Sequence, residues 1–115
     1  MEIEITPFEK EKQYGQLIKK NVRQFLRYNS VNIEATVAFN FVSQNKIYKL
    51  NQKYRHLNKP TNVLSFPIWE KKFSIPKTGA VNLGDIFICE DFVENPEELE
   101  SLIKHSLNHL IGKHH

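Results

Sequence analysis

The run Ile86-Phe87-Ile88-Cys89 places four apolar residues in succession at the end of a segment, 81–89, that is expected to be a strand. Side chains in a strand point alternately to its two faces, so this run is apolar on both faces. Such a strand is stable in the interior of a sheet whose two faces are both covered. The chain is therefore expected to build a sheet with this segment near its centre and helices packed on it.

A second segment has the period of a strand that buries one face. Between residues 31 and 41 every second residue is apolar, namely Val31, Ile33, Ala35, Val37, Phe39 and Phe41. Shorter strands are expected at residues 2–6 and 63–66, the latter ended by Pro67. Residues 68–80 contain Pro76 and Gly79 and are expected to form a loop or hairpin connection.

Three segments have the 3-to-4 residue spacing of amphipathic helices, and each follows a capping residue. Thr6-Pro7-Phe8-Glu9 offers an N-cap threonine, a proline at the first helical position and a glutamate three residues after the cap. Asn95-Pro96-Glu97-Glu98 repeats this pattern ahead of the final helix, and Ser43 precedes the middle one. The helices are expected to end near residues 27, 54 and 111.

These elements predict an α/β fold, in the order β-α-β-α-β-β-α, with a mixed sheet of about four strands and packed helices. The final helix is expected to face the sheet with Leu99, Leu102, Ile103, Leu107 and Leu110. With 115 residues, of which 40% are hydrophobic and 25% charged, residues 1–115 are expected to form one soluble domain.

Composition excludes several classes of protein. The single cysteine, Cys89, is incompatible with a disulfide-framework secreted domain. No apolar run approaches the roughly 18–20 residues that span a bilayer, and the first residues lack the order of a signal peptide. We therefore expect a cytoplasmic protein with no membrane partner. A net charge of +3 permits a polyanion such as RNA as partner, but does not require one.

Four of the five histidines lie in the last eleven residues. On a helix, His105 and His109 project from one face with Cβ atoms about 5–6 Å apart, so both can bind one metal ion. Gly112 favours a helix end, after which the returning chain can supply His115, or His114 in its place. Three imidazoles with an open position are typical of catalytic zinc, although copper, nickel or iron also accept imidazole.

Simpler explanations stay open at this point. A histidine pair four residues apart usually lies on the surface or in the core without binding a metal. His114-His115 can be the remnant of an affinity tag. Zinc peptidases share the spacing H-x3-H-x2-G-x2-H, but they need a glutamate directly after the first histidine to activate water. Ser106 occupies that position, which disfavours a peptidase.

Three blocks of sequence are distinctive. The first consists of Leu50-Asn51-Gln52-Lys53-Tyr54-Arg55 and then Lys59-Pro60-Thr61-Asn62-Val63-Leu64-Ser65-Phe66-Pro67. These two segments are close to the sequence patterns LN-x-x-YR and KPTDVLSFP. The second is Leu83-Gly84-Asp85-Ile86, and the third is the closing histidine run, which is similar to HG-x-LHL-x-GYDH. In this order the blocks resemble the YbeY family, metal-dependent bacterial endoribonucleases involved in ribosomal RNA maturation.

The resemblance implies a role for each of several residues. It makes Arg55 the catalytic arginine, and a guanidinium suits a phosphodiester because it donates two parallel hydrogen bonds. Ser65, on a strand that the family places beside the active cleft, is a candidate substrate contact. Asp85 is expected to brace a turn or a metal-binding histidine. The implied ligands of one Zn²⁺ or similar ion per chain are His105, His109 and His115.

The expected function is therefore that of a zinc-dependent endoribonuclease acting on single-stranded RNA in ribosomal RNA maturation and ribosome quality control. Its partners would be RNA, in particular ribosomal RNA and the ribosome, and not DNA. A non-catalytic, ribosome-associated RNA-binding factor with a structural metal site is the alternative. The chain departs from the family pattern at Asn62 (usually Asp), Ser106 (Gly), Asn108 (Leu) and Lys113-His114 (Tyr-Asp).

Overall fold

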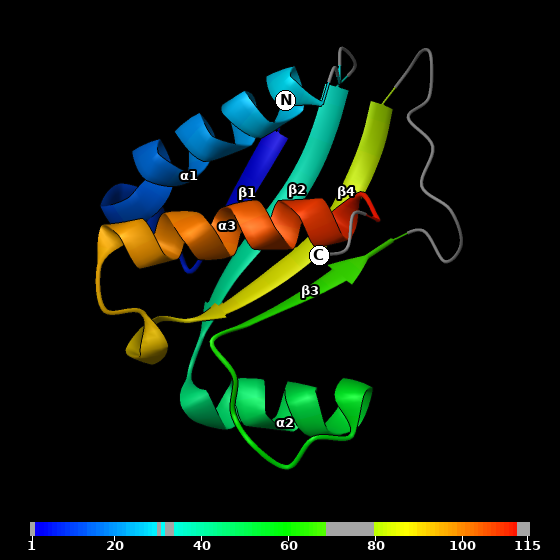
Figure 1. The fold of residues 1–115 in the computed structure, drawn as a ribbon. Coiled ribbons are helices and arrows are strands. Elements are labelled where there is room, and N and C mark those ends of the chain that lie inside the picture. The colour runs from blue at the N-terminus through cyan, green and yellow to red at the C-terminus, as the bar shows by residue number, and fades with distance from the viewer. Residues whose placement is uncertain (1, 30, 32–33, 69–79, 113–115) are drawn as a thin grey trace.

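The computed structural model describes residues 2–29, 31, 34–68 and 80–112. These residues form a four-stranded mixed sheet with helices on both faces (Figure 1). The elements are, in chain order, β1 (Glu2–Thr6), α1 (Phe8–Tyr28), β2 (Glu34–Val42), α2 (Gln44–Arg55), β3 (Val63–Pro67), β4 (Ala80–Cys89), the single 3-10 turn η1 (Glu90–Phe92) and α3 (Pro96–Leu110). The expected fold class and element order are confirmed.

The strands lie in the order β1-β2-β4-β3. β1, β2 and β4 are parallel, whereas β3 runs antiparallel to β4. β4 thus has a neighbour on each side, and Ile86, Ile88 and Cys89 are fully buried. The apolar run at residues 86–89 does belong to an interior strand covered on both faces.

Each face of the sheet carries its own apolar core. The larger core joins α1 and α3 to the face of β2 that bears Val37 and Phe39. The smaller core joins α2 to the opposite face through Ile47, Leu64 and Cys89. In α3 the buried apolar residues are Leu99, Ile103, Leu107 and Leu110, as expected, while Leu102 is only partly buried.

Two of the three expected helix caps are confirmed. Ser43 Oγ accepts a hydrogen bond from the Lys46 amide at 3.1 Å, and Asn95 Oδ1 accepts one from the Glu98 amide at 2.8 Å. The prediction that Thr6 caps α1 is wrong. Thr6 is the last residue of β1, its register partner is Asn40, and its hydroxyl donates to Asn40 Oδ1 at 2.9 Å. Because pairing with β2 keeps Thr6 in the sheet, α1 begins two residues later.

Gly84 lies at an irregularity where β4 meets both of its neighbours. The register between β2 and β4 shifts beside it, and its φ is +127°, a value that L side chains rarely adopt. An added Cβ would lie 2.3 Å from the carbonyl oxygen of Phe66 in β3. The glycine therefore lets β3 approach β4 closely, which fixes the position of the strand that carries Ser65.

Two further expectations concern the connection between β3 and β4 and the absence of a membrane span. Of the connection expected at residues 68–80, residues 69–79 lie outside the described residues. Within the part of the chain that is described, no helix is both long and apolar enough to cross a membrane.

Candidate active site

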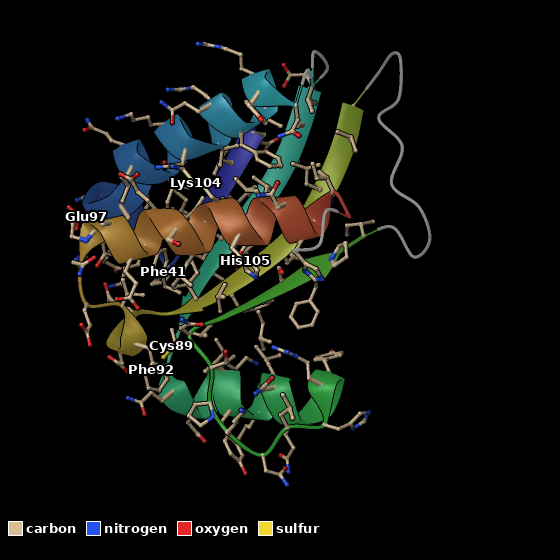
Figure 2. All side chains as sticks on the ribbon, in the orientation of Figure 1. Phe41, Cys89, Phe92, Glu97, Lys104 and His105 are labelled. Carbon is tan, nitrogen blue, oxygen red and sulfur yellow. The ribbon has the colours of Figure 1, made fainter. Side chains whose placement is uncertain are left out.

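A cleft of about 370 Å³ lies where the end of α2, strand β3 and the second half of α3 meet. Its wall includes Arg55, Ser65, His105 and His109. Residues separated by 54 positions in the sequence, from 55 to 109, thus share one cleft. Figure 2 shows the labelled His105 on the edge of α3 away from α1. Of the predicted site residues that the structure describes, all except Asp85 line this cleft.

The packing of α3 on the sheet places its histidines at the cleft. Ile103 and Leu107 are fully buried against the sheet, and His105 and His109 lie beside this buried stripe. His105 is exposed, while His109 is half-buried. Gly112 has a φ of +79°, and its amide donates to the carbonyl oxygen of His109 at 3.0 Å. The helix therefore ends at the glycine, as its left-handed conformation predicts.

Ser65 makes a direct side-chain contact with one of the histidines. Its Oγ lies 2.5 Å from His109 Nδ1, a hydrogen-bond distance. Its neighbours in β3, Leu64 and Phe66, point to the opposite face and pack in the smaller core with α2. A histidine that binds a metal through Nε2 commonly donates Nδ1–H to an oxygen, and Ser65 is placed to accept that bond. Sequence reasoning assigned Ser65 to the substrate and missed this contact.

Arg55 is the last residue of α2, and its side chain is exposed at the cleft. Asn51, one turn earlier, is fully buried and donates from Nδ2 to the carbonyl oxygen of Lys59 at 2.8 Å. The backbone carbonyl of Asn51 accepts from the amide of Leu57, and His56 turns the chain with a φ of +57°. These bonds hold the segment between α2 and β3, and so fix Arg55 relative to Ser65.

Asn51 is a site-shaping residue that sequence reasoning quoted but did not interpret. Its position in the LN-x-x-YR block was the available signal. A buried carboxamide within a helix usually has a specific hydrogen-bonding role, because an unpaired one is costly. The role depends on Lys59, eight residues later, and becomes visible only when the intervening turn is known.

Asp85 is not brought to the described histidines. In the β3–β4 register Asp85 is paired with Phe66, and opposed residues on antiparallel strands point to the same face. That face is the α2 side, where Asp85 lines a separate pocket with Tyr54, Phe66 and Phe87. Ser65 and His109 lie on the other side of the sheet, so an Asp85 brace for His105 or His109 is not what the structure shows.

Of the three predicted metal ligands, His105 and His109 belong to the described residues, whereas His115 lies outside them, as does His114. Residues 2–112, apart from their undescribed gaps, contain no group of three side chains that could hold a metal ion. His105 and His109 nevertheless line one cleft, and His109 has an oxygen at Nδ1. This donor set fits a zinc ion that takes a further ligand from another part of the chain.

A second cluster of polar groups joins the first turns of α1 to η1. Glu90 accepts hydrogen bonds from Lys10 Nζ and from the Tyr14 hydroxyl, the latter at 2.7 Å. Burial and the hydrogen bond to Glu90 raise the pKa of Tyr14 to about 12, and the bond from Lys10 lowers the pKa of Glu90. Tyr14 also stacks on Phe41, so this cluster ties α1 to the sheet.

Known proteins resemble this chain over most of its length. Residues 2–115 match the sequence model of a family described as Endoribonuclease YbeY. A protein of that name from Pelagibacter ubique is 42% identical over 84 residues, which cover 64% of this chain and 53% of the relative. A namesake from Syntrophus aciditrophicus is 34% identical over 107 residues, 85% of this chain and 65% of the relative.

A third relative of the same name, from Lachnospira eligens, is 29% identical over an alignment 129 positions long, which covers 89% of this chain and 76% of the relative. The chain thus spans between 53% and 76% of the length of these three relatives. A protein from Thermotoga maritima with a known solution structure has the same fold, with a TM-score of 0.55 and 24% identity over 96% of this chain and 72% of its own. With the match over residues 2–115, the chain belongs to the YbeY endoribonuclease family.

Proposed function

We propose that this chain is a zinc-dependent endoribonuclease that cleaves single-stranded RNA. The observation that carries the proposal is the single cleft lined by Arg55, His105 and His109. It combines a permanent cation with two metal-binding side chains, which together can bind and activate a phosphodiester. The name Endoribonuclease YbeY, shared by the family and the relatives, supports RNA as the substrate. Ribosomal RNA in the cytoplasm, during ribosome maturation and quality control, is the proposed setting.

Arg55 is the group proposed to bind the scissile phosphate. Its guanidinium can donate two parallel hydrogen bonds to two phosphate oxygens, which orients the phosphorus in the cleft. Negative charge grows on these oxygens as the phosphorus becomes five-coordinate, so the same bonds strengthen in the transition state. The turn held by Asn51 fixes the backbone from which the Arg55 side chain reaches the cleft.

His105 and His109 are proposed to hold the metal, with His115 as the third ligand. A zinc ion bound there would act as a Lewis acid on a phosphoryl oxygen or on water. Ser65 Oγ would accept a hydrogen bond from Nδ1–H of His109 and so direct Nε2 toward the ion. Ser65 thus acts through His109 and is a positioning residue in this proposal.

The alternatives differ in what the cleft should do. A non-catalytic RNA-binding factor would keep the metal and the RNA affinity without cleavage. A zinc peptidase would need an acid directly after His105, but Ser106 is 1% exposed and is not part of the cleft wall. The structure therefore adds a geometric reason against peptide hydrolysis to the missing glutamate.

The test combines metal content with cleavage. A labelled single-stranded RNA, the same RNA as a duplex, and single-stranded DNA are incubated with protein that is metal-loaded, chelated, or reloaded with zinc. Wild type is expected to carry about one zinc per chain and to cleave the single-stranded RNA only when loaded. His109→Ala should lose both properties. His56→Asn is the matched control, because His56 is exposed, lies outside the cleft wall, and has a left-handed φ that Asn tolerates.

Two results would count against the proposal. Equal zinc content in wild type and His109→Ala would remove the metal site. RNA binding with normal zinc content but no cleavage would favour the RNA-binding factor instead.

A further inference from the structure

A second groove, of about 290 Å³, lies between α1 and α3. We call it the α1–α3 groove. From α1 it is lined by Asn21, Gln24, Phe25 and Tyr28, and from α3 by Lys104 and Asn108. Figure 2 shows Lys104 on the edge of α3 that faces α1, whereas His105 lies on the opposite edge. The groove is thus separate from the cleft described above, although α3 forms a wall of both.

Lys104 is the charged residue among the described side chains that line the α1–α3 groove. Residues 17–28 of α1 and 103–110 of α3 contain no acid, but the four Lys and Arg of the α1 segment are not among the described lining residues, and Lys19 is paired with Glu11. The acidic residues of both helices lie in their first halves. The two helices run in roughly the same direction (Figure 1), so their acid-free halves lie together at the groove. Lys104 therefore lies in an acid-free part of both helices and can attract one anionic group, such as a phosphate.

The side chains in the α1–α3 groove are those that bind an unstacked nucleotide. Tyr28 is 87% exposed and offers an aromatic face on which a base can stack. Gln24 and Asn108 carry carboxamides, which can both donate to and accept from the polar edges of a base. Lys104 is exposed and can pair with a phosphate. An acidic peptide would use Lys104 but would leave the aromatic face and the carboxamides without matching groups.

The floor of the groove is polar as well. Asn21 is 2% exposed and donates from Nδ2 to the carbonyl oxygen of Leu17 at 2.8 Å. Its Oδ1 has no hydrogen-bond partner among the described residues. That oxygen is shielded from solvent, so the carboxamides of Gln24 and Asn108, rather than that of Asn21, are available to a base.

The positions of the two sites on α3 suggest that one RNA strand uses both. Lys104 and Asn108 directly precede His105 and His109, so the groove and the cleft flank the same two turns of the helix. A helix with its side chains is about 10–12 Å across, a width that a short single strand can cross. We propose that the α1–α3 groove binds a nucleotide of the RNA whose scissile phosphate lies in the cleft, with its base stacked on Tyr28. This inference rests on the proposed function.

The test measures the affinity of a fluorescent single-stranded RNA of about twelve nucleotides, within the range of common single-strand sites, by anisotropy. Tyr28→Ala should weaken binding about fivefold or more, the usual effect of losing one base–aromatic stack. Tyr28→Phe keeps the ring and should bind within about twofold of wild type. Phe8→Ala is the matched control, because Phe8 is also exposed, at 65%, but lies at the other end of α1. Lys104→Gln should reduce the salt dependence of binding by about one phosphate contact.

The outcomes separate this inference from the proposed function. If wild type binds and cleaves RNA but Tyr28→Ala binds as tightly as wild type, the groove inference is overturned and the proposed function stands. A groove that binds a protein instead of RNA would also leave the RNA affinity of Tyr28→Ala equal to that of wild type, and would overturn the inference in the same way. If wild type neither binds nor cleaves single-stranded RNA, both proposals fall.

Discussion

Replacing Gly84 by alanine should separate β3 from β4 at the last residues of β3, next to Ser65. The residue has a φ of +127°, and an added Cβ would lie 2.3 Å from the Phe66 carbonyl oxygen and 3.0 Å from Pro67 Cα. Both neighbours are backbone atoms of β3, so no side-chain rotation can relieve the overlap. Either the strands shift apart or the backbone of β4 changes conformation.

The size of the effect follows from two separate costs. An L residue held in a backbone region that is normally reserved for glycine costs about 1–3 kcal/mol. Overpacking of a closely packed site costs a further 1–3 kcal/mol or so. Gly84→Ala should therefore lower the free energy of unfolding by about 2–6 kcal/mol, a large share of the roughly 5–15 kcal/mol of a typical domain.

The assay is urea unfolding of wild type, Gly84→Ala and a matched control, Gly15→Ala. Gly15 lies within α1, where an added Cβ would meet only the flexible Glu11 side chain, at 3.3 Å. Alanine is the better helix former by about 1 kcal/mol, so the control should be unchanged or slightly more stable. A loss below about 0.5 kcal/mol for Gly84→Ala, or an equal loss for both variants, would refute the reasoning.

Three further predictions concern the core, a buried hydroxyl and the Glu90 cluster. Ile103 is fully buried, so Ile103→Ala should cost about 2–5 kcal/mol in urea unfolding, and a surface-like loss below about 0.5 kcal/mol would contradict the packing of α3. Ser106 Oγ is buried without a hydrogen-bond partner in the described part of the chain, so Ser106→Ala should be neutral or up to about 1 kcal/mol more stable; a clear loss would reveal a bond. Because the pKa of Tyr14 is raised to about 12, its stabilising contribution should be complete below its ordinary value of 10.0 and be lost as the pH rises toward 12. The lowered pKa of Glu90 acts at acid pH. The contribution of Glu90 to stability is present above the ordinary carboxyl pKa and is lost as the pH falls through the lowered value. Tyr14→Phe, compared with wild type across both ranges, measures this, and a stability difference that does not vary with pH would contradict it.

Features of the fold that depend on local sequence were predictable. The apolar run at residues 86–89 and the caps at Ser43 and Asn95 act within a few residues, so their patterns can be recognised without the fold. Thr6 shows where this fails. Its local pattern is that of a helix cap, but Thr6 pairs with a residue 34 positions away, in β2, and the sheet determines its conformation.

The candidate site divides in the same way. The proximity of His105 and His109 follows from helical spacing alone. The Ser65–His109 bond depends on how α3 crosses β3, and the position of Asp85 depends on the β3–β4 register. Neither is encoded in a spacing along the chain. Arg55 could be assigned only through the family resemblance, since an exposed arginine at the end of a helix has no distinguishing pattern of its own.

The most direct test of the central claim, that the cleft cleaves RNA, compares Arg55→Lys with Arg23→Lys. Both arginines are exposed and lie on helices, but only Arg55 lines the cleft. Lysine keeps the charge and loses the two parallel hydrogen bonds, so the orientation of the phosphate should suffer while overall attraction remains. With zinc content, folding and RNA affinity measured alongside, Arg55→Lys should lose most of the single-turnover cleavage of a single-stranded RNA, and Arg23→Lys should cleave like wild type. Cleavage by Arg55→Lys at the wild-type rate would contradict the account.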